Sequence, residues 1–160
     1  MVDPGYVVLR RQGVTLSSLD WIGRKLSRAL RPGDLVFLYG PLGAGKTTFV
    51  RVIARALGVS DPVRSPSFTI ANIYSGTVTI QHLDLYRLDE IGDDDALALE
   101  EYVRDDAVTL VEWPQAGLGR LGAPMWTVRF DHESRHQRSV EIETATAEAR
   151  DRWEAADSDE

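Results

Sequence analysis

The sequence predicts an α/β sandwich in which helices flank a mixed β-sheet that is parallel at its centre. Two short apolar runs support this, LVFLY at Leu35–Tyr39 and VTLV within Ala107–Trp113, because unbroken apolar runs are typical of strands buried on both faces. Apolar and polar residues alternate at Met125–Asp131 and Arg138–Thr144, which indicates half-exposed strands at one side of the sheet. A helical pattern follows the first apolar run, in the order expected of an α/β protein.

The elements before the first buried run are predicted to be a strand and an amphipathic helix. Tyr6–Leu9 fits a short strand. Ser17 or Ser18 can cap a helix that ends before Pro32-Gly33. The apolar stripe of this helix consists of Leu19, Ile22, Leu26 and Leu30.

The elements after the first buried run begin with a second helix. Its apolar residues are Phe49, Ile53 and Leu57, and Gly58 is the expected C-cap. Ser67–Tyr74 and Thr77–Leu83 are predicted to be strands joined near Ser75-Gly76 as an antiparallel hairpin, and Asp94–Val103 is predicted to be helical.

Length and composition indicate one domain. The 160 residues suit a single domain at 1–150, and residues 151–160 suit an acidic C-terminal tail after a fraying helix. A net charge of −7 argues against a protein that grips nucleic acid alone, and the absence of cysteine excludes disulfides and thiolate chemistry. Without a signal peptide or an apolar run of roughly 18 residues, a soluble cytoplasmic protein is expected.

The segment between the first buried strand and the second helix, GPLGAGKT at Gly40–Thr47, matches G-x-x-x-x-G-K-[ST] in full. Its glycines allow successive N–H groups to turn around a phosphate. Lys46 supplies a cation to the β and γ phosphates, and the Thr47 hydroxyl ligates Mg²⁺. The sequence therefore predicts a P-loop NTPase with Lys46 in a catalytic role. The expected nucleotide contacts are Gly40, Pro41, Leu42, Gly43, Ala44, Gly45, Lys46, Thr47 and Thr48.

Two carboxylates compete for the place beside the metal. Glu112 ends the fully apolar run VTLV, so it should emerge beside the phosphates, and it is assigned to Mg²⁺. Asp84 follows a more polar strand and is the candidate for orienting or deprotonating the attacking water. The D-x-x-G match at Asp89–Gly92 lacks a buried strand before it, and no N-K-x-D motif occurs in the chain. The histidines His82, His132 and His136 are not spaced as a metal site and are expected to be structural or solvated.

Four blocks, GPLGAGKTTFVR, SPSFT, HLDLYRL and VEWPQ, occur in this order between Gly40 and Gln115. In these blocks the chain resembles the TsaE family, ATPases that work with TsaB and TsaD in making N6-threonylcarbamoyladenosine on tRNA. The resemblance implies an Mg²⁺-dependent ATP hydrolase that cycles the TsaB–TsaD partners and meets tRNA only through the complex. The preference for adenine comes from the resemblance, since no local motif reads the base.

The resemblance also implies roles for particular residues. Thr47 and Glu112 would serve Mg²⁺, and Asp84 would be needed for activity. Ser65–Thr69 would form a switch-like segment near the γ phosphate, in which Ser67 and Thr69 could sense it. The family has a glycine-bearing turn near the nucleotide where this chain has ESRHQR at residues 133–138. Ser134, Arg135 or Arg138 could replace it, with Arg135 counted among the nucleotide-binding candidates.

Two other functions remain open from the sequence. A small-molecule or nucleoside kinase would use the same loop, but the chain offers no arginine-bearing lid and no acceptor pocket. An ATP-sensing scaffold would bind the nucleotide without productive turnover. Because no arginine finger can be identified, hydrolysis is expected to be slow alone and faster when partners order the switch segment.

Overall fold

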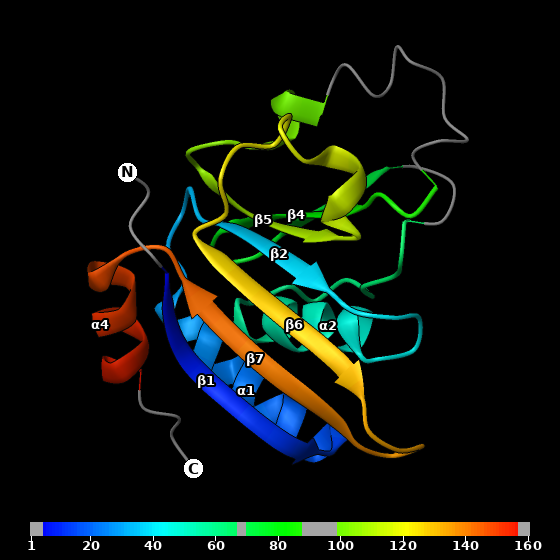
Figure 1. The fold of residues 1–160 in the computed structure, drawn as a ribbon. Coiled ribbons are helices and arrows are strands. Elements are labelled where there is room, and N and C mark those ends of the chain that lie inside the picture. Colours follow the sequence, from blue (N-terminus) through cyan, green and yellow to red (C-terminus); the bar gives the residue numbers. More distant parts are fainter. Residues whose placement is uncertain (1–4, 67–69, 88–98, 157–160) are drawn as a thin grey trace.

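The computed structural model describes residues 5–66, 70–87 and 99–156, which form a seven-stranded sheet with the order β1-β7-β6-β2-β5-β4-β3 (Figure 1). The strands are β1 (Tyr6–Val14), β2 (Leu35–Tyr39), β3 (Ala71–Ser75), β4 (Thr79–Asp84), β5 (Ala107–Glu112), β6 (Trp126–His132) and β7 (Arg138–Thr144). The helices are α1 (Leu16–Ala29), α2 (Lys46–Ala56) and α4 (Ala147–Ala155), with 3₁₀ turns η2 (Leu99–Tyr102) and η3 (Pro114–Gly117).

The centre of the sheet is parallel and its sides are antiparallel. β2 lies between β5 and β6 and runs parallel to both, and β4 runs parallel to β5. β7 pairs antiparallel with β6 and β1, and β3 pairs antiparallel with β4 as the predicted hairpin. This arrangement confirms the predicted α/β class with a mixed, centrally parallel sheet.

The core lies on both faces of the sheet. The larger cluster packs α1 and α2 against one face, and their buried residues include Leu19, Ile22, Phe49 and Ile53. A smaller cluster on the other face contains Phe37, Leu83 and Leu99. Every residue from Ala107 to Glu112 is buried, in agreement with a strand covered on both faces.

Several boundaries differ from the sequence predictions. α1 is capped by Thr15, whose hydroxyl oxygen accepts from the Ser18 amide at 3.3 Å, and not by Ser17 or Ser18. β1 continues to Val14, five residues past the predicted end, with irregular pairing to β7. The helix predicted at Asp94–Val103 is a short 3₁₀ turn at Leu99–Tyr102, and its first five residues lie outside the described part.

The C-terminal segment also differs from the predicted tail. α4 runs across residue 150, and Trp153 in its second half is only 4% exposed. Arg152 donates through Nη1 to the Ala29 carbonyl at 2.9 Å and to Asp34 Oδ2 at 3.3 Å. This part of the chain is therefore attached to the domain through Arg152, Trp153 and Ala156. No helix of the described chain is long and apolar enough to cross a membrane.

Candidate active site

The loop between β2 and α2 lies at the edge of the sheet where the parallel strands end. Gly40, Gly43 and Gly45 have φ values of +152°, +75° and +109°, a region that L side chains rarely adopt. A Cβ on Gly40 would lie 2.8 Å from the Phe130 carbonyl oxygen, so a side chain cannot be placed there without moving β6. Gly45 also serves as the N-cap of α2, whose first amides point toward the loop.

Lys46, the first residue of α2, is only 4% exposed. Its ammonium group donates to the carbonyl of Gly40 and lies 3.4 Å from the centroid of the Trp113 ring. Burial lowers the pKa of Lys46 from its ordinary value, and the nearby carboxylates of Glu112 and Asp84 partly oppose that shift. The lysine is thus a buried cation at the base of the loop, held by a carbonyl and an aromatic face.

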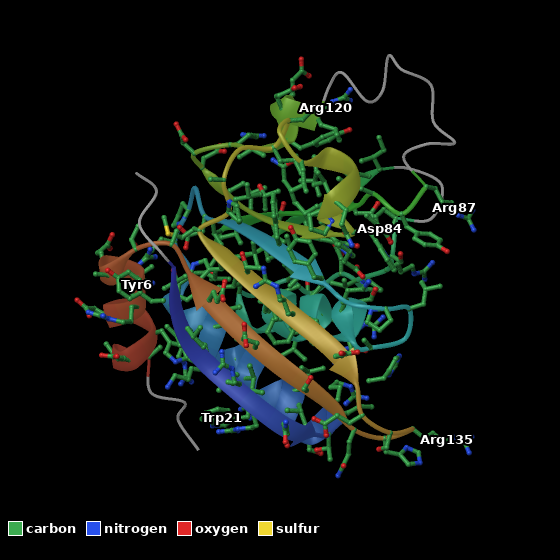
Figure 2. The ribbon with its side chains drawn as sticks, viewed as in Figure 1. Tyr6, Trp21, Asp84, Arg87, Arg120 and Arg135 are labelled. Carbon is green, nitrogen blue, oxygen red and sulfur yellow. The ribbon has the colours of Figure 1, made fainter. Side chains whose placement is uncertain are left out.

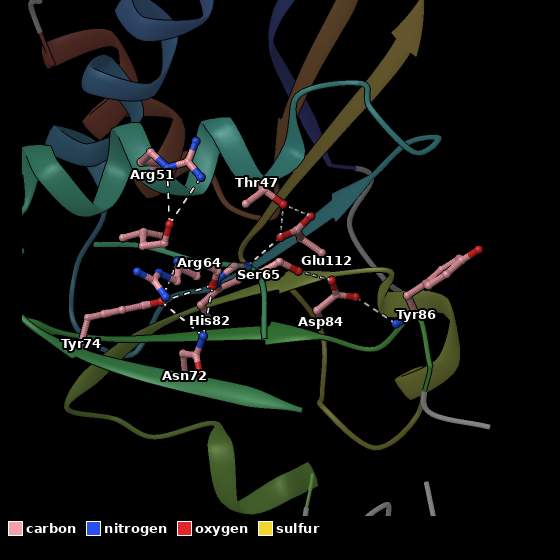
Figure 3. A network of polar contacts seen from close by, with 11 residues as sticks. Thr47, Arg51, Arg64, Ser65, Asn72, Tyr74, His82, Asp84, Tyr86 and Glu112 are labelled. Carbon is pink, nitrogen blue, oxygen red and sulfur yellow. Dashed lines mark hydrogen bonds and ion pairs between the residues drawn. The ribbon is translucent and has the colours of Figure 1, made fainter. Parts of the chain in front are cut away.

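The two candidate acids end adjacent strands. Asp84 and Glu112 are register partners in the parallel pair β4–β5, and Leu38 of β2 is the partner of Glu112 on the other side. The Glu112 carboxylate is buried, and both of its oxygens lie 3.0 Å from the Thr47 hydroxyl (Figure 3). His82 Nε2 lies 2.6 Å from Glu112 Oε2. The site thus joins α2, β4 and β5 through one carboxylate.

Asp84 is half-buried and its two oxygens accept from different groups. The Ser65 hydroxyl donates to Oδ2 and the Tyr86 amide donates to Oδ1, each at 3.0 Å (Figure 3). Ser65 begins the segment predicted to act as a switch, so this segment touches Asp84. The other two residues of that prediction, Ser67 and Thr69, lie outside the described residues.

The chain that leads to Ser65 is fixed by side chains of α2 and β3. The Arg51 guanidinium lies 3.4 Å from the Val63 carbonyl, and the Tyr74 hydroxyl accepts from the Arg64 amide at 3.1 Å. Asn72 donates to the Arg64 carbonyl at 3.1 Å (Figure 3). Ser65 therefore starts from a well-bonded position beside the loop.

Trp113 follows Glu112 and has the only positive φ among the described non-glycine residues, at φ 55° and ψ 52°. This left-handed conformation is costly for a bulky residue. It turns the chain sharply after β5, and the indole lies against Lys46 and, at 4.8 Å between ring centroids, against Tyr86. Trp113 thus forms a wall of the site.

A cavity of about 380 Å³ brings most of these groups together. It is lined by Leu16, Leu42, Gly43, Gly45, Lys46, Thr47, Thr48, Ser65, Asp84, Glu112, Trp113 and Arg138. Gly40, Pro41 and Ala44, which were also predicted to contact a nucleotide, do not line it. Ala44 is fully buried, and Gly40 faces the site through the carbonyl that accepts from Lys46.

Arg135 does not line the cavity either, and Figure 2 shows it at the end of the β6–β7 hairpin, away from Asp84. It lines a neighbouring hollow of about 340 Å³ with Thr15, Ser17 and His136. Arg138 borders both spaces, is 6% exposed, and donates through Nη1 to the Val14 carbonyl at 3.1 Å. Of the two arginines of this turn, Arg138 is therefore the one beside the loop.

The family described as "Threonylcarbamoyl adenosine biosynthesis protein TsaE" matches residues 15–140, most of the chain. The chain belongs to the TsaE family. It is 45% identical over 91 residues to the tRNA threonylcarbamoyladenosine biosynthesis protein TsaE of Bacillus subtilis, an alignment that covers 56% of each chain. It is 37% identical over 123 residues to the TsaE of Mycobacterium bovis, covering 71% of this chain and 73% of that protein.

A solved structure supports the same fold. The crystal structure of Bacillus subtilis YdiB superposes with a TM-score of 0.76 and 28% identity, and the match covers 96% of each chain. The resemblance to TsaE found in the four sequence blocks is thereby confirmed. The TsaE family is named for threonylcarbamoyl adenosine biosynthesis, so membership of the family assigns the chain to that pathway.

The TsaE site has a donor set that suits a magnesium ion delivered with phosphates. Thr47 offers a hydroxyl and Glu112 a carboxylate, both oxygen ligands. Within the described residues no group of three or more His, Cys, Asp or Glu side chains could hold a metal by itself. Mg²⁺ commonly takes one or two protein ligands and completes its shell with water and substrate phosphates. The residues present fit that mode.

Sequence reasoning missed one contact of this TsaE site. His82 was expected to be structural or solvated; it is fully buried, and its Nε2 lies 2.6 Å from Glu112 Oε2, a partner that the sequence did not indicate. The signal was present in HLD, because residues two apart on a strand share a face and His82 therefore lies on the face of Asp84. The sequence did not show the parallel register of β4 and β5, which puts Glu112 directly opposite Asp84 and diagonal to His82.

Proposed function

We propose that this protein is the Mg²⁺-dependent ATPase of the tRNA N6-threonylcarbamoyladenosine machinery, and that its ATP hydrolysis cycles the TsaB–TsaD partners. It acts in the cytoplasm and meets tRNA only through that complex. The observation that carries the proposal is the contact of Thr47 with Glu112 beside the buried Lys46, at the end of a glycine loop with three positive φ angles. Membership of the TsaE family supplies the pathway.

The residues have distinct roles in the proposed reaction. Loop amides and the start of α2 bind the phosphates, and Lys46 moves from the Gly40 carbonyl to the negative charge of the transferred phosphoryl group. Thr47 and Glu112 hold Mg²⁺, which neutralises phosphate charge when bound. Asp84 orients the attacking water, and its contacts to Ser65 and the Tyr86 amide fix the carboxylate.

Slow turnover by the isolated protein is part of the proposal. Lys46 is paired with the Gly40 carbonyl and Trp113, and Thr47 is paired with Glu112. A nucleotide with its metal has to exchange these contacts for its own. A partner that reorders the segment at Ser65 would favour the exchanged state, because that segment touches Asp84.

The test uses the purified full chain with and without TsaB–TsaD. Calorimetry should detect Mg²⁺-dependent ATP binding, and phosphate release should rise when the partners are added. Asp84→Asn should retain binding and lose roughly 10²-fold or more of the hydrolysis rate, whereas Lys46→Ala should lose binding.

Other outcomes distinguish the rival functions. Phosphate transfer to a nucleoside in place of water would indicate a kinase. Binding with no turnover in the presence of partners would indicate an ATP-sensing scaffold. Absence of any Mg²⁺-dependent nucleotide binding by the folded protein would overturn the proposal.

A further inference from the structure

His82 lies directly behind the carboxylate that faces Thr47. It is fully buried in β4, two residues before Asp84, so the two side chains share one face of the sheet. Asp84 is the register partner of Glu112, and His82 reaches Glu112 along the diagonal, with Nε2 at 2.6 Å from Oε2. Both side chains of this pair are almost entirely closed to solvent.

The hydrogen-bond partners of the two ring nitrogens indicate the role of His82. A buried structural histidine normally pairs both ring nitrogens, because an unpaired buried polar atom is costly. Here Nδ1 has no hydrogen-bond partner in the part of the chain that the structure describes. The contact to Glu112 is thus the only hydrogen bond of the ring among those residues, and a purely apolar side chain would otherwise suit the position better.

The Glu112 carboxylate is held from two sides. The Thr47 hydroxyl contacts both oxygens at 3.0 Å from α2, and His82 contacts Oε2 from β4. If the histidine contact were absent, the carboxylate could turn about its side-chain bonds and follow the hydroxyl when that hydroxyl binds a metal. With it, the carboxylate keeps its orientation when Thr47 moves to another ligand.

We propose that His82 is a positioning residue that holds Glu112 for Mg²⁺, and this inference rests on the proposed function. The imidazole donates its Nε2 proton to Glu112 and touches neither nucleotide nor metal. Partners behind a metal ligand fix its direction, and their loss typically costs 10- to 100-fold in metal affinity or activity. His82 should therefore affect the magnesium requirement and leave metal-free nucleotide binding unchanged.

A matched pair of variants tests the role. The amide nitrogen of glutamine can take the place of Nε2, whereas that of asparagine lies near Nδ1 and cannot reach Glu112. His82→Asn should raise the Mg²⁺ concentration for half-maximal ATP hydrolysis by about 10- to 100-fold. ATP affinity in EDTA should stay within about twofold of wild type. His82→Gln should restore the Mg²⁺ concentration for half-maximal hydrolysis to within about threefold of the wild-type value.

Two controls separate positioning from general damage. Gln81→Leu changes the preceding buried residue of β4, whose side chain faces the other side of the sheet, and it should leave the Mg²⁺ requirement unchanged. In a Glu112→Ala background, His82→Asn should cause no further change in the Mg²⁺ concentration for half-maximal ATP hydrolysis, because His82 acts only through Glu112. An additive effect in this double variant would overturn the inference.

The outcomes distinguish this inference from the proposed function. If wild type shows no Mg²⁺-dependent ATP binding, the proposed function fails and the inference fails with it. If wild type does show it and His82→Asn has the wild-type Mg²⁺ requirement, only the inference fails. Should His82→Asn not fold, NMR of the wild-type imidazole decides. Its Nε2 resonance should move when Mg²⁺ is added to the ATP complex, and an unmoved resonance overturns the inference.

Discussion

Trp153 joins α4 to the rest of the domain, and replacing it by Ala should destabilise the protein strongly. The side chain is 4% exposed and belongs to the main core cluster. The Lys25 ammonium nitrogen lies 4.8 Å from the centroid of its ring. A buried tryptophan hides about 150–250 Å². At about 25 cal/mol per Å² this corresponds to roughly 4–6 kcal/mol as an upper bound. Measured truncations of this kind cost about 3–5 kcal/mol, which is the expected loss for Trp153→Ala.

Scanning calorimetry provides the assay. For 160 residues the unfolding entropy is about 0.34 kcal/mol per kelvin, so a loss of about 3–5 kcal/mol lowers the Tm by about 9–15 °C. Glu154→Ala, an exposed position on the same helix, should change the free energy of unfolding by less than about 0.5 kcal/mol. A Trp153→Ala protein within about 1 kcal/mol of wild type would refute the packing argument and support a domain that ends at residue 150.

Three further predictions concern the sheet and the loop. Gln81→Leu should raise the free energy of unfolding in urea by about 1 kcal/mol, because neither polar atom of this buried amide has a partner among the described residues; a loss of stability would contradict this. Gly40→Ala should lower ATP affinity at least about tenfold by calorimetry, since its Cβ would lie 2.8 Å from the Phe130 carbonyl oxygen; wild-type affinity would count against the loop geometry. Lys46→Met should match or exceed the wild-type stability at pH 7 while losing ATP binding. Because the folded pKa of Lys46 is lowered, the unfolded chain binds more protons between that pKa and 10.5, so the stability advantage of the variant should shrink as the pH rises through this window; a constant difference in urea midpoints would refute it.

The parts of the fold that local patterns determine were predictable from the sequence. Leu35–Tyr39 is a strand with the predicted bounds, because an apolar run of only five residues between Pro32-Gly33 and Gly40 suits a strand covered on both faces and is too short for a buried helix. The extension of β1 to Val14 was not predictable, since Arg10, Arg11 and Gln12 are all exposed and show no alternation. Their strand conformation comes from pairing with β7, more than 120 residues away in sequence.

The site was predictable where one motif encodes it and not where it depends on contacts between distant segments. The motif contains the loop, Lys46 and Thr47, and the apolar run before Glu112 selects that acid. That Arg138 and not Arg135 borders the cavity could not be predicted from ESRHQR, because it depends on where β7 begins and on how the β6–β7 turn lies relative to the loop. The role of His82 depends on the β4–β5 register in the same way.

The polar groups of the site satisfy one another, and this has a consequence for the proposed ATPase. Lys46 bonds the Gly40 carbonyl, Thr47 bonds Glu112, and Asp84 accepts from Ser65. Binding of a magnesium nucleotide has to break the first two contacts, and each hydrogen bond to a charged group is worth about 1.5–3 kcal/mol. The free energy that the phosphate contacts contribute to nucleotide binding is reduced by that amount. Binding of the nucleotide alone therefore does not bring all the catalytic groups into their reactive positions. Ser65 contacts Asp84 and begins the segment predicted to switch. A partner acting on this segment would therefore change the position of the carboxylate that orients the water. Faster turnover in the complex is the expected result.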